Sequence, residues 1–271
     1  MTDPYGSVDG LCVSLSAGVL ELRLDRAAKR NALTDEMVAA MIGAVDAAGR
    51  DEAVRVISLR AEGDHFCTGF DIVGRNAGDG GRRPRAGSIQ RRLPSQAHRL
   101  VPLLCTVQTP VVVAAAGWTA GIGLQLVLAA DVALVAEDAR LWEPFSERGL
   151  TPDSGATWLL PRRVGEVRAR EMLLLGRVLS GTEAAAWGLV HRAVPASDLA
   201  ATADDVVGSL AAGPTVALGL TKWLLHAGAQ APLEQHLRDE AFAMELGSRT
   251  DDFREGLAAF KEKRPPRFEG R

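Results

Sequence analysis

The sequence predicts an α/β fold in which strands pair in parallel, followed by a helical C-terminal region. Residues 111–116 and 132–136 are rich in β-branched and apolar side chains, as strands buried on both faces of a sheet are. Helical segments alternate with the predicted strands, and this alternation is typical of parallel sheets. From about Ser197 only helical patterns follow. We therefore predict a core over residues 1–196 and a helical region over residues 197–271.

The first part of the chain predicts a β-hairpin, a helix and a further strand. Residues 11–15 and 19–24 alternate apolar and polar side chains around a short Ala-Gly turn, as the two strands of a hairpin do. Thr34 is a good N-cap for the helix that follows, and residues 54–59 form a third strand. The apolar residues of that helix recur at helical spacing, and they are Met37, Val38, Met41, Ile42 and Val45.

The C-terminal region contains four predicted helices, over residues 206–212, 214–227, 233–246 and 252–261. Because these helices have no strand among them, they can pack on the core of their own chain or on a neighbouring subunit. Upstream, residues 75–92 stand apart, with a glycine-rich run and six arginines. This segment is interpreted either as a surface loop or as a lid whose positive charge helps to hold phosphates.

Composition excludes several classes of function. The net charge of -3 over 271 residues gives no general case for binding nucleic acid or an anionic membrane. Cys12, Cys67 and Cys105 have neither paired nor metal-ligand spacing, which suits free thiols in a reducing cytosol. The N-terminus lacks the basic and apolar parts of a signal peptide, and no apolar run approaches the roughly 20 residues of a membrane span. We expect a cytoplasmic protein without a metal site.

Two glycine-containing turns can present backbone N–H groups to an oxygen atom. Gly117-x-x-x-Gly121-Ile122-Gly123 precedes an apolar helix, whose first N–H groups have no partner within the helix. The turn Thr68-Gly69-Phe70-Asp71 can direct the Phe70 amide into a cleft. Each turn also has a plain alternative, which is tight helix–strand packing for the first and an ordinary strand-to-helix turn for the second.

A lone carboxylate, Asp153, lies on a later turn before another helix. Its position also suits an N-cap, because aspartate is a preferred capping residue. The functional alternative is a general acid or base in an apolar cleft beside Phe145 and Trp158. The five histidines show no metal-ligand spacing.

Taken together, these motifs resemble the crotonase, or enoyl-CoA hydratase/isomerase, superfamily. The resemblance covers nearly the whole chain and implies a spiral of ββα units with a helical C-terminal oligomerisation region that forms trimers or hexamers. It also implies an acyl-CoA thioester substrate, with coenzyme A as part of the substrate and no separate cofactor. The matching segments, in order, are 30–33, 66–71, 110–131, 149–155, 184–190 and 260–264.

The resemblance assigns roles to individual residues. The backbone N–H groups of Phe70 and Ile122 would form an oxyanion hole for the thioester carbonyl, and family members usually have glycine where Ile122 stands. Lys263 would reach the nucleotide of coenzyme A, in some members from an adjacent subunit. The residues that match coenzyme A or substrate contacts of the family are Lys29, Arg30, Ala32, Thr68, Asp71, Gly121, Phe145 and Lys263.

The departures from the family pattern favour isomerisation. Family hydratases carry two glutamates, where this chain has Gln125 and Phe145, and neither residue can act as an acid or base near neutral pH. Asp153 matches the catalytic aspartate of non-hydratase members, and its surroundings resemble the 1,2-epoxyphenylacetyl-CoA isomerase group and related enoyl-CoA isomerases. We therefore expect a double-bond or related isomerase with Asp153 as the proton shuttle.

Three alternatives stay open at this point. One is an enoyl-CoA hydratase of atypical mechanism. The second is a hydrolase resembling the 4-chlorobenzoyl-CoA dehalogenases, in which Asp153 would be the nucleophile and His98 would activate water. The third is an inactive acyl-CoA-binding or scaffold protein. The acyl group itself is not identified by the sequence.

Overall fold

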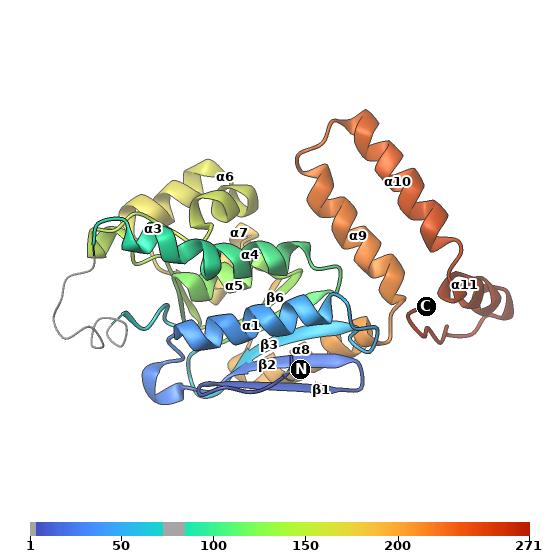
Figure 1. The fold of residues 1–271 in the computed structure, drawn as a ribbon, viewed down its shortest axis with the longest axis horizontal. Helices are drawn as coiled ribbons and strands as arrows, with labels where there is room; N and C mark the ends of the chain where they lie inside the picture. Colours follow the sequence, from blue (N-terminus) through green and yellow to red (C-terminus); the bar gives the residue numbers. More distant parts are fainter. Residues whose placement is uncertain (1–3, 73–84) are drawn as a thin grey trace.

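The computed structural model describes residues 4–72 and 85–271, and a six-stranded sheet forms its centre (Figure 1). The strand order is β1-β2-β3-β4-β6-β9. Strands β1 and β2 are antiparallel, and every other neighbouring pair is parallel, which confirms the predicted α/β class. The strands are β1 (Leu11–Ser16), β2 (Val19–Leu24), β3 (Val56–Ala61), β4 (Val111–Ala115), β6 (Val132–Ala136) and β9 (Arg192–Val194).

The predicted hairpin and the first helix are confirmed. Ala17 and Gly18 both have positive φ, the conformation that a tight two-residue hairpin turn requires. Helix α1 (Asp35–Ala48) begins after Thr34, whose Oγ1 accepts a hydrogen bond from the Met37 N–H at 3.1 Å. Strand β3 begins two residues later than predicted, because the Val54 N–H is used in a turn, where it donates to the Asp51 carbonyl.

Helices cover both faces of the central sheet. Helices α1 and α4 (Ala97–Thr106) each pack one face into the main hydrophobic core, and α5 (Ile122–Ala129) is buried on all sides. Helix α8 (Leu199–Ala211) covers the other face, where Val207 meets Val56 and Val112. The predicted boundary at 196/197 therefore separates α8 from the sheet that it covers.

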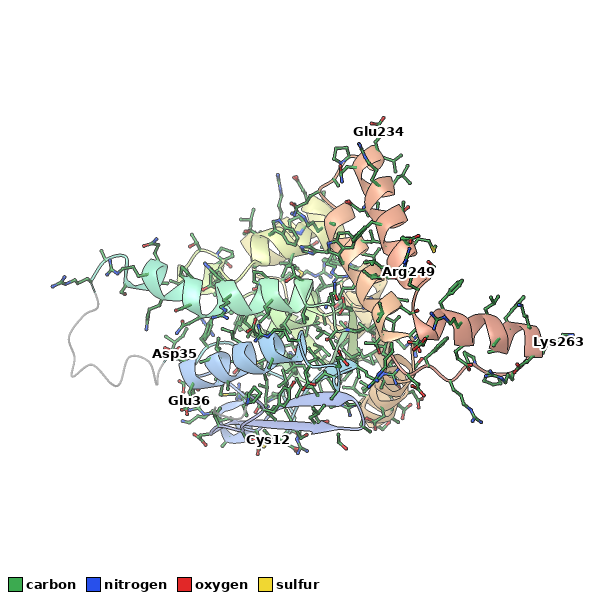
Figure 2. The ribbon with its side chains drawn as sticks, turned by 45° about the vertical axis from the view of Figure 1, so that its right-hand side comes forward. Cys12, Asp35, Glu36, Glu234, Arg249 and Lys263 are labelled. Atoms are coloured by element: carbon green, nitrogen blue, oxygen red, sulfur yellow. The ribbon has the colours of Figure 1, made fainter. Side chains whose placement is uncertain are left out.

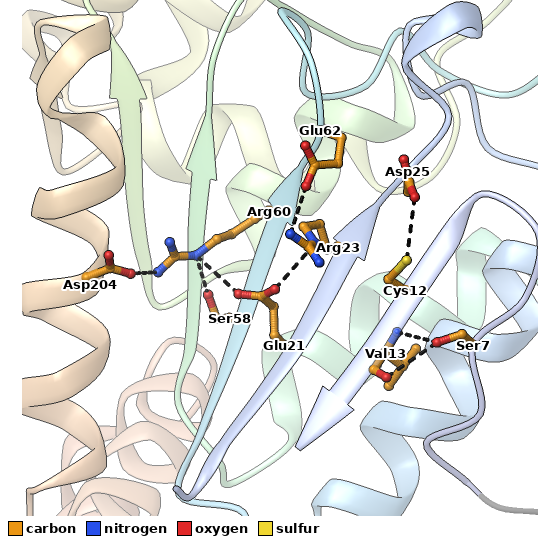
Figure 3. A network of polar contacts seen from close by, with 10 residues as sticks. All are labelled: Ser7, Cys12, Val13, Glu21, Arg23, Asp25, Ser58, Arg60, Glu62 and Asp204. Atoms are coloured by element: carbon orange, nitrogen blue, oxygen red, sulfur yellow. Dashed lines mark hydrogen bonds and ion pairs between the residues drawn. The ribbon is translucent and has the colours of Figure 1, made fainter. Parts of the chain in front are cut away.

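Polar side chains reinforce the attachment of α8 (Figure 3). Arg60 on β3 donates to Asp204 on α8 at 2.6 Å and to Ser58 at 3.0 Å. On the neighbouring strand β2, Glu21 lies between Arg60 and Arg23 and pairs with both of them. A network of charged side chains therefore adds to the apolar packing that holds α8 against the sheet.

A second, smaller sheet and several short helices complete the core. The small sheet has the order β5-β7-β8, with β5 and β7 parallel. Among the described residues, the remaining elements of the core are β5 (Trp118–Ala120), β7 (Arg140–Trp142), β8 (Leu179–Ser180), α3 (Ser88–Arg92), α6 (Ala156–Leu175), α7 (Gly181–Trp187) and the 3-10 helices Ala27–Lys29, Leu93–Ser95, Ser146–Arg148 and Ala196–Asp198.

The last three helices extend away from the sheet (Figures 1 and 2), and the predicted absence of strands there is confirmed for the elements after residue 198. They are α9 (Thr215–Gly228), α10 (Leu233–Gly247) and α11 (Asp251–Glu262). Within residues 4–72 and 85–271, no helix combines the length and the apolar composition needed to cross a bilayer.

Lys222 joins α9 to the core. Its Nζ lies 2.7 Å from Asp131 Oδ2 and donates to the Leu104 carbonyl at 2.9 Å. Burial lowers the pKa of Lys222, and the nearby Asp131 carboxylate opposes that change. Asp131 Oδ2 also accepts the Val111 N–H at the start of β4, so this one carboxylate connects α9 to the central sheet.

We predict that Lys222→Met destabilises the protein. The substitution keeps most of the buried side-chain volume but leaves the Asp131 carboxylate without its cation. The expected loss in the free energy of unfolding is about 3 kcal/mol, at the lower end of what breaking a buried pair costs, since Asp131 is partly exposed. Chemical denaturation measures this loss. The control, Lys261→Met on the exposed face of α11, should change stability by less than about 0.5 kcal/mol. Equal midpoints for the two variants would contradict this role of Lys222.

Candidate active site

Two turns that are far apart in the sequence meet at one side of the small sheet. Cys67 forms a parallel bridge with Thr119, and the Ala120 N–H donates to the Cys67 carbonyl at 2.8 Å. A β-carbon at Gly123 would lie 2.5 Å from the Cys67 carbonyl oxygen, so only glycine fits there. The tight packing considered for the glycine motif is therefore present, and it brings the Phe70 and Ile122 turns together.

A cavity of about 270 Å³ opens beside these two turns. It is lined by Phe70, Gly121, Ile122, Phe145 and Asp153, which the sequence assigned to the site. Asp153 is the only carboxylate among the described residues that line it. The structure thus places one acid and the two proposed oxyanion donors around a common space.

The Ile122 N–H has the right origin for an oxyanion donor. Ile122 is the first residue of α5, so its N–H has no partner within the helix. Gly121 precedes it as the N-cap, with φ 54° and ψ -128°, a conformation that glycine adopts readily. The side chain of Ile122 is apolar and buried, so the backbone N–H is the group at this position that can donate a hydrogen bond.

Asp153 is not an N-cap. Helix α6 begins at Ala156 with Gly155 as its N-cap, and no side chain caps it, so the capping interpretation of Asp153 is wrong. Instead, Asp153 Oδ1 accepts a hydrogen bond from Ser154 Oγ at 2.8 Å. Ser154 is buried and has φ 54°, a left-handed conformation that is uncommon outside glycine. This turn orients the carboxylate at some cost in backbone strain, as functional sites often do.

A larger cleft of about 840 Å³ adjoins the first cavity. It is lined by the predicted coenzyme A contacts Lys29, Arg30, Ala32, Thr68 and Asp71. Thr68 and Phe70 line both spaces, so the cleft and the cavity are contiguous.

Three side chains hold the loop that carries these contacts. Arg26, which sequence analysis did not single out, lies 2.9 Å from Asp71 and donates to the Ala32 carbonyl at 3.0 Å. Asn31 is fully buried with φ 54°, and its side chain accepts the Arg26 N–H at 2.7 Å. Its Nδ2 also donates to the carbonyls of Glu62 and His65. Asp71 and Asn31 therefore shape the mouth of the cleft from within the protein.

The structure does not bring Lys263 or His98 to this site. Lys263 follows the last turn of α11, at the outer end of the helical region in Figure 2, and is not among the residues that line the cleft. His98 is exposed and lines a separate cavity with Trp158 and His226. Most of the arginine-rich segment 75–92 lies outside the described residues, although Arg92 lines the smaller cavity.

Glu143, a buried carboxyl group that directly precedes the cavity-lining residues Pro144 and Phe145, was not predicted from the sequence. Glu143 and Gln125 have no exposed surface, and Gln125 Nε2 donates to Glu143 Oε1 at 2.7 Å. Burial raises the pKa of Glu143 to about 8, opposed by the hydrogen bond from Gln125 and aided by the Asp153 charge. No pattern in the sequence distinguishes this glutamate from an exposed one.

No metal site is found within the described ranges, since no group of three or more histidine, cysteine, aspartate or glutamate residues there could hold an ion. The three cysteines are free. Cys67 lies under the Phe70 turn, and burial raises the pKa of its thiol to about 12. It is therefore an inert packing residue near neutral pH.

Comparisons with known proteins agree on one family. The family model described as "Enoyl-CoA hydratase/isomerase" matches residues 14–271. The chain is 37% identical to the 1,2-epoxyphenylacetyl-CoA isomerase of Escherichia coli over 94% of this chain and 96% of the relative. It is 39% identical to a probable enoyl-CoA hydratase of Rhodobacter capsulatus, over 95% and 96%. A solved enoyl-CoA hydratase/isomerase structure from Mycobacterium abscessus aligns with a TM-score of 0.89 at 35% identity, covering 96% of this chain and all of that one.

The buried Glu143 should make stability depend on pH. Its pKa is raised on folding, so between about pH 4.5 and pH 8 the folded state holds a proton that the unfolded state has released. Stability therefore falls with rising pH in this window, by up to about 1.4 kcal/mol per pH unit from this group. Glu143→Gln removes the titration, so the free energy of unfolding of this variant relative to wild type should rise from pH 5 to pH 8. Urea denaturation of both proteins at four pH values measures this difference in the free energy of unfolding. A difference that does not change with pH would contradict the raised pKa of Glu143.

Proposed function

The chain belongs to the enoyl-CoA hydratase/isomerase family, and from this we propose that it is an isomerase that moves a double bond, or makes a related rearrangement, in an acyl-CoA thioester. The observation that carries the proposal is the position of Asp153. It is the only carboxylate that lines the cavity within the described residues, and Phe70 and Ile122 line the same cavity. One acid and two backbone donors are what a proton shuttle through an enolate needs.

The chemistry follows from these groups. The Asp153 carboxylate takes a proton from C2 of a 3-enoyl-CoA, and the electron pair moves into the thioester to form an enolate. The N–H groups of Phe70 and Ile122 stabilise the negative oxygen. Asp153 then returns the proton to C4, which leaves a 2-enoyl-CoA of unchanged mass. Since C2 and C4 are separated by one carbon, one carboxylate can reach both of them.

Hydration is less well supported than isomerisation. It requires acid–base groups that position and activate a water molecule, and Phe145, which lines the cavity, has no proton to exchange. Gln125 is fully buried and is a neutral amide. Glu143 is also fully buried and is not among the cavity-lining residues, so it does not supply the missing acid at the substrate.

Hydrolysis and a scaffold role are the other candidates. The hydrolytic mechanism needs a histidine that activates water beside Asp153, whereas His98 is exposed and lines a different cavity. A scaffold role would not require Asp153 to face a cavity, and the aspartate is not explained by helix capping. These observations favour an active enzyme with Asp153 at its centre.

The proposal includes self-association and a cytoplasmic location. The three free cysteines fit a reducing compartment. Large apolar side chains are exposed along the last three helices, and surfaces of this kind mark sites of association. A homotrimer, or a hexamer made of two trimers, would cover them. The exposed residues are Val216, Leu225, Leu233, Leu237, Phe242, Met244, Leu246, Phe253, Leu257 and Phe260.

The first test uses Asp153→Asn, which keeps the shape of the side chain and removes its basicity. Purified protein is incubated with a 3-enoyl-CoA, and the products are separated by chromatography with mass spectrometry. Wild type should give a product of unchanged mass and shifted retention. The variant should be slower by at least about 10²-fold, the range expected for loss of a general base.

The control is Asp205→Asn on the exposed side of α8, which should keep full activity. Full activity in Asp153→Asn would contradict the assignment of the proton shuttle. A gain of one water in the wild-type product would instead indicate hydration, and release of free coenzyme A would indicate hydrolysis. No product from either aliphatic or aromatic acyl-CoA substrates would support the scaffold alternative.

The second test concerns the assembly. Size-exclusion chromatography with light scattering should give three or six times the mass of one chain. Leu237→Asp combined with Phe242→Asp on α10 should reduce the mass, because a charge is costly to bury in an apolar interface. Ala201→Asp on α8 is the control and should leave the mass unchanged. A monomeric wild type would contradict the proposed assembly.

A further inference from the structure

The buried pair Glu143 and Gln125 lies behind the oxyanion turn and has no role in the chemistry described so far. Both residues have no exposed surface, and neither lines the cavity. Gln125 Nε2 uses its two hydrogens on two acceptors, Glu143 Oε1 at 2.7 Å and the Gly121 carbonyl at 3.0 Å. Glu143 directly follows β7, and Gln125 lies in the first turn of α5, so the pair connects the end of β7 to the start of this helix.

The Gly121 carbonyl belongs to the same peptide group as the Ile122 N–H. Because a peptide group is planar and trans, fixing the direction of its carbonyl also fixes the direction of its N–H. This carbonyl accepts three hydrogen bonds, from the backbone N–H groups of Leu124 at 2.8 Å and Gln125 at 3.1 Å, and from Gln125 Nε2. Such bonds also polarise the peptide and make its N–H a better donor.

The other side of Gly121 is held by the same segment. The Gly121 N–H donates to the Trp142 carbonyl at 3.1 Å, and Trp142 directly precedes Glu143. The peptide group before Gly121 is therefore bonded directly to Trp142. The peptide group after Gly121 is connected to Glu143 through the side chain of Gln125. A glycine in this position has wide backbone freedom, so the added contacts restrict a peptide that could otherwise rotate.

The pair is costly as a purely structural feature. Glu143 Oε2 and Gln125 Oε1 are buried and have no hydrogen-bond partner among the described residues. A buried polar atom without a partner costs about 1–3 kcal/mol, and apolar side chains of similar volume would avoid this cost. This cost is explained if the pair serves to orient the Gly121–Ile122 peptide.

We propose that Glu143 and Gln125 are positioning residues that hold the Gly121–Ile122 peptide, so that the Ile122 N–H points at the thioester carbonyl oxygen. Neither side chain touches the substrate, and each acts through the backbone. The inference rests on the proposed function only in taking an acyl-CoA thioester as the ligand. It does not depend on which reaction follows.

The direct test measures polarisation of the thioester carbonyl without any reaction. A saturated acyl-CoA with ¹³C at the thioester carbon is bound to wild type, Gln125→Met and Glu143→Met, and its carbonyl stretch is followed by isotope-edited infrared spectroscopy. Hydrogen bonds in the oxyanion hole lower this frequency. We expect a clear downward shift in wild type, a smaller shift in both variants, and the wild-type shift in the exposed control Glu52→Met.

Kinetics give an independent readout. An interaction that serves mainly the enolate should appear in kcat and not in KM. We expect kcat to fall about tenfold in Gln125→Met, while KM stays within about twofold of the wild-type value. This fall is smaller than the roughly 10²–10³-fold loss in kcat when an oxyanion donor is removed entirely, because the Ile122 N–H is still present. Glu143→Gln should restore most of the kcat that Glu143→Met loses, because its side-chain oxygen still accepts from Gln125.

The pH profile separates positioning from simple packing. Burial raises the pKa of Glu143 to about 8, and Asp153 is the other ionisable group whose charge acts on it. Above that pH, a buried negative charge behind the hole opposes the developing enolate, so wild-type kcat should fall. Glu143→Gln, which does not ionise, should lack this fall.

The outcomes distinguish this inference from the proposed function. An unchanged carbonyl shift in folded Gln125→Met that still binds the acyl-CoA would overturn the inference and leave the proposed function intact. If the methionine variants fail to fold, an identical pH profile of kcat for Glu143→Gln and wild type would overturn the inference. If wild type binds no acyl-CoA at all, both the proposed function and this inference are wrong.

Discussion

The site depends on the close contact between the turn after Phe66 and the turn after Gly117. In the proposed oxyanion hole, the N–H groups of Phe70 and Ile122, which lie about 50 residues apart, must converge on one oxygen atom, and hydrogen-bond geometry tolerates little error in either. The bridge between Cys67 and Thr119 sets the separation of the two backbones, and Gly123 allows it because any larger residue would collide with the Cys67 carbonyl. Since the donors are backbone groups, Ile122 can replace the usual glycine without removing the N–H itself.

Local patterns predicted much of this structure because their causes are local. Thr34 caps α1 through a hydrogen bond to a residue three positions away, and the Ala-Gly turn closes the first hairpin. The glycines at 121 and 123 indicated a turn into a helix for the same reason. Asp153 could be selected as a candidate because it lies on a turn before a helix and matches the catalytic aspartate of the resembled family, but the sequence could not separate capping from catalysis. That distinction depends on where α6 begins, which the backbone of Ser154 and Gly155 decides.

Contacts over long sequence distances were not predictable in this way. Glu143 is buried because β7 pairs with β5 and brings Glu143 against α5. The residues next to Glu143 in the sequence do not indicate that burial. Lys222 shows the same limit, since its partners Leu104, Thr109 and Asp131 come from the core more than 90 positions earlier. Arg26 and Asn31 also act through tertiary contacts. Sequence patterns thus identified residues that line the cavity and the cleft more readily than the residues that hold them in place.

The amide at position 125 links the chemistry of the site to its geometry. An ionised carboxylate has only acceptor atoms, so it could not donate to the Gly121 carbonyl, whereas the Gln125 amide donates to that carbonyl and to Glu143 at once. Gln125 therefore cannot act as a general acid or base, but it supplies a hydrogen-bond donor behind the proposed oxyanion turn. Under the proposed function, acid–base chemistry would rest on Asp153 among the described residues, because Phe145 lines the cavity and Glu143 is fully buried. A site of this kind favours a reaction in which one proton leaves the substrate and returns to it, over a reaction that must also activate water.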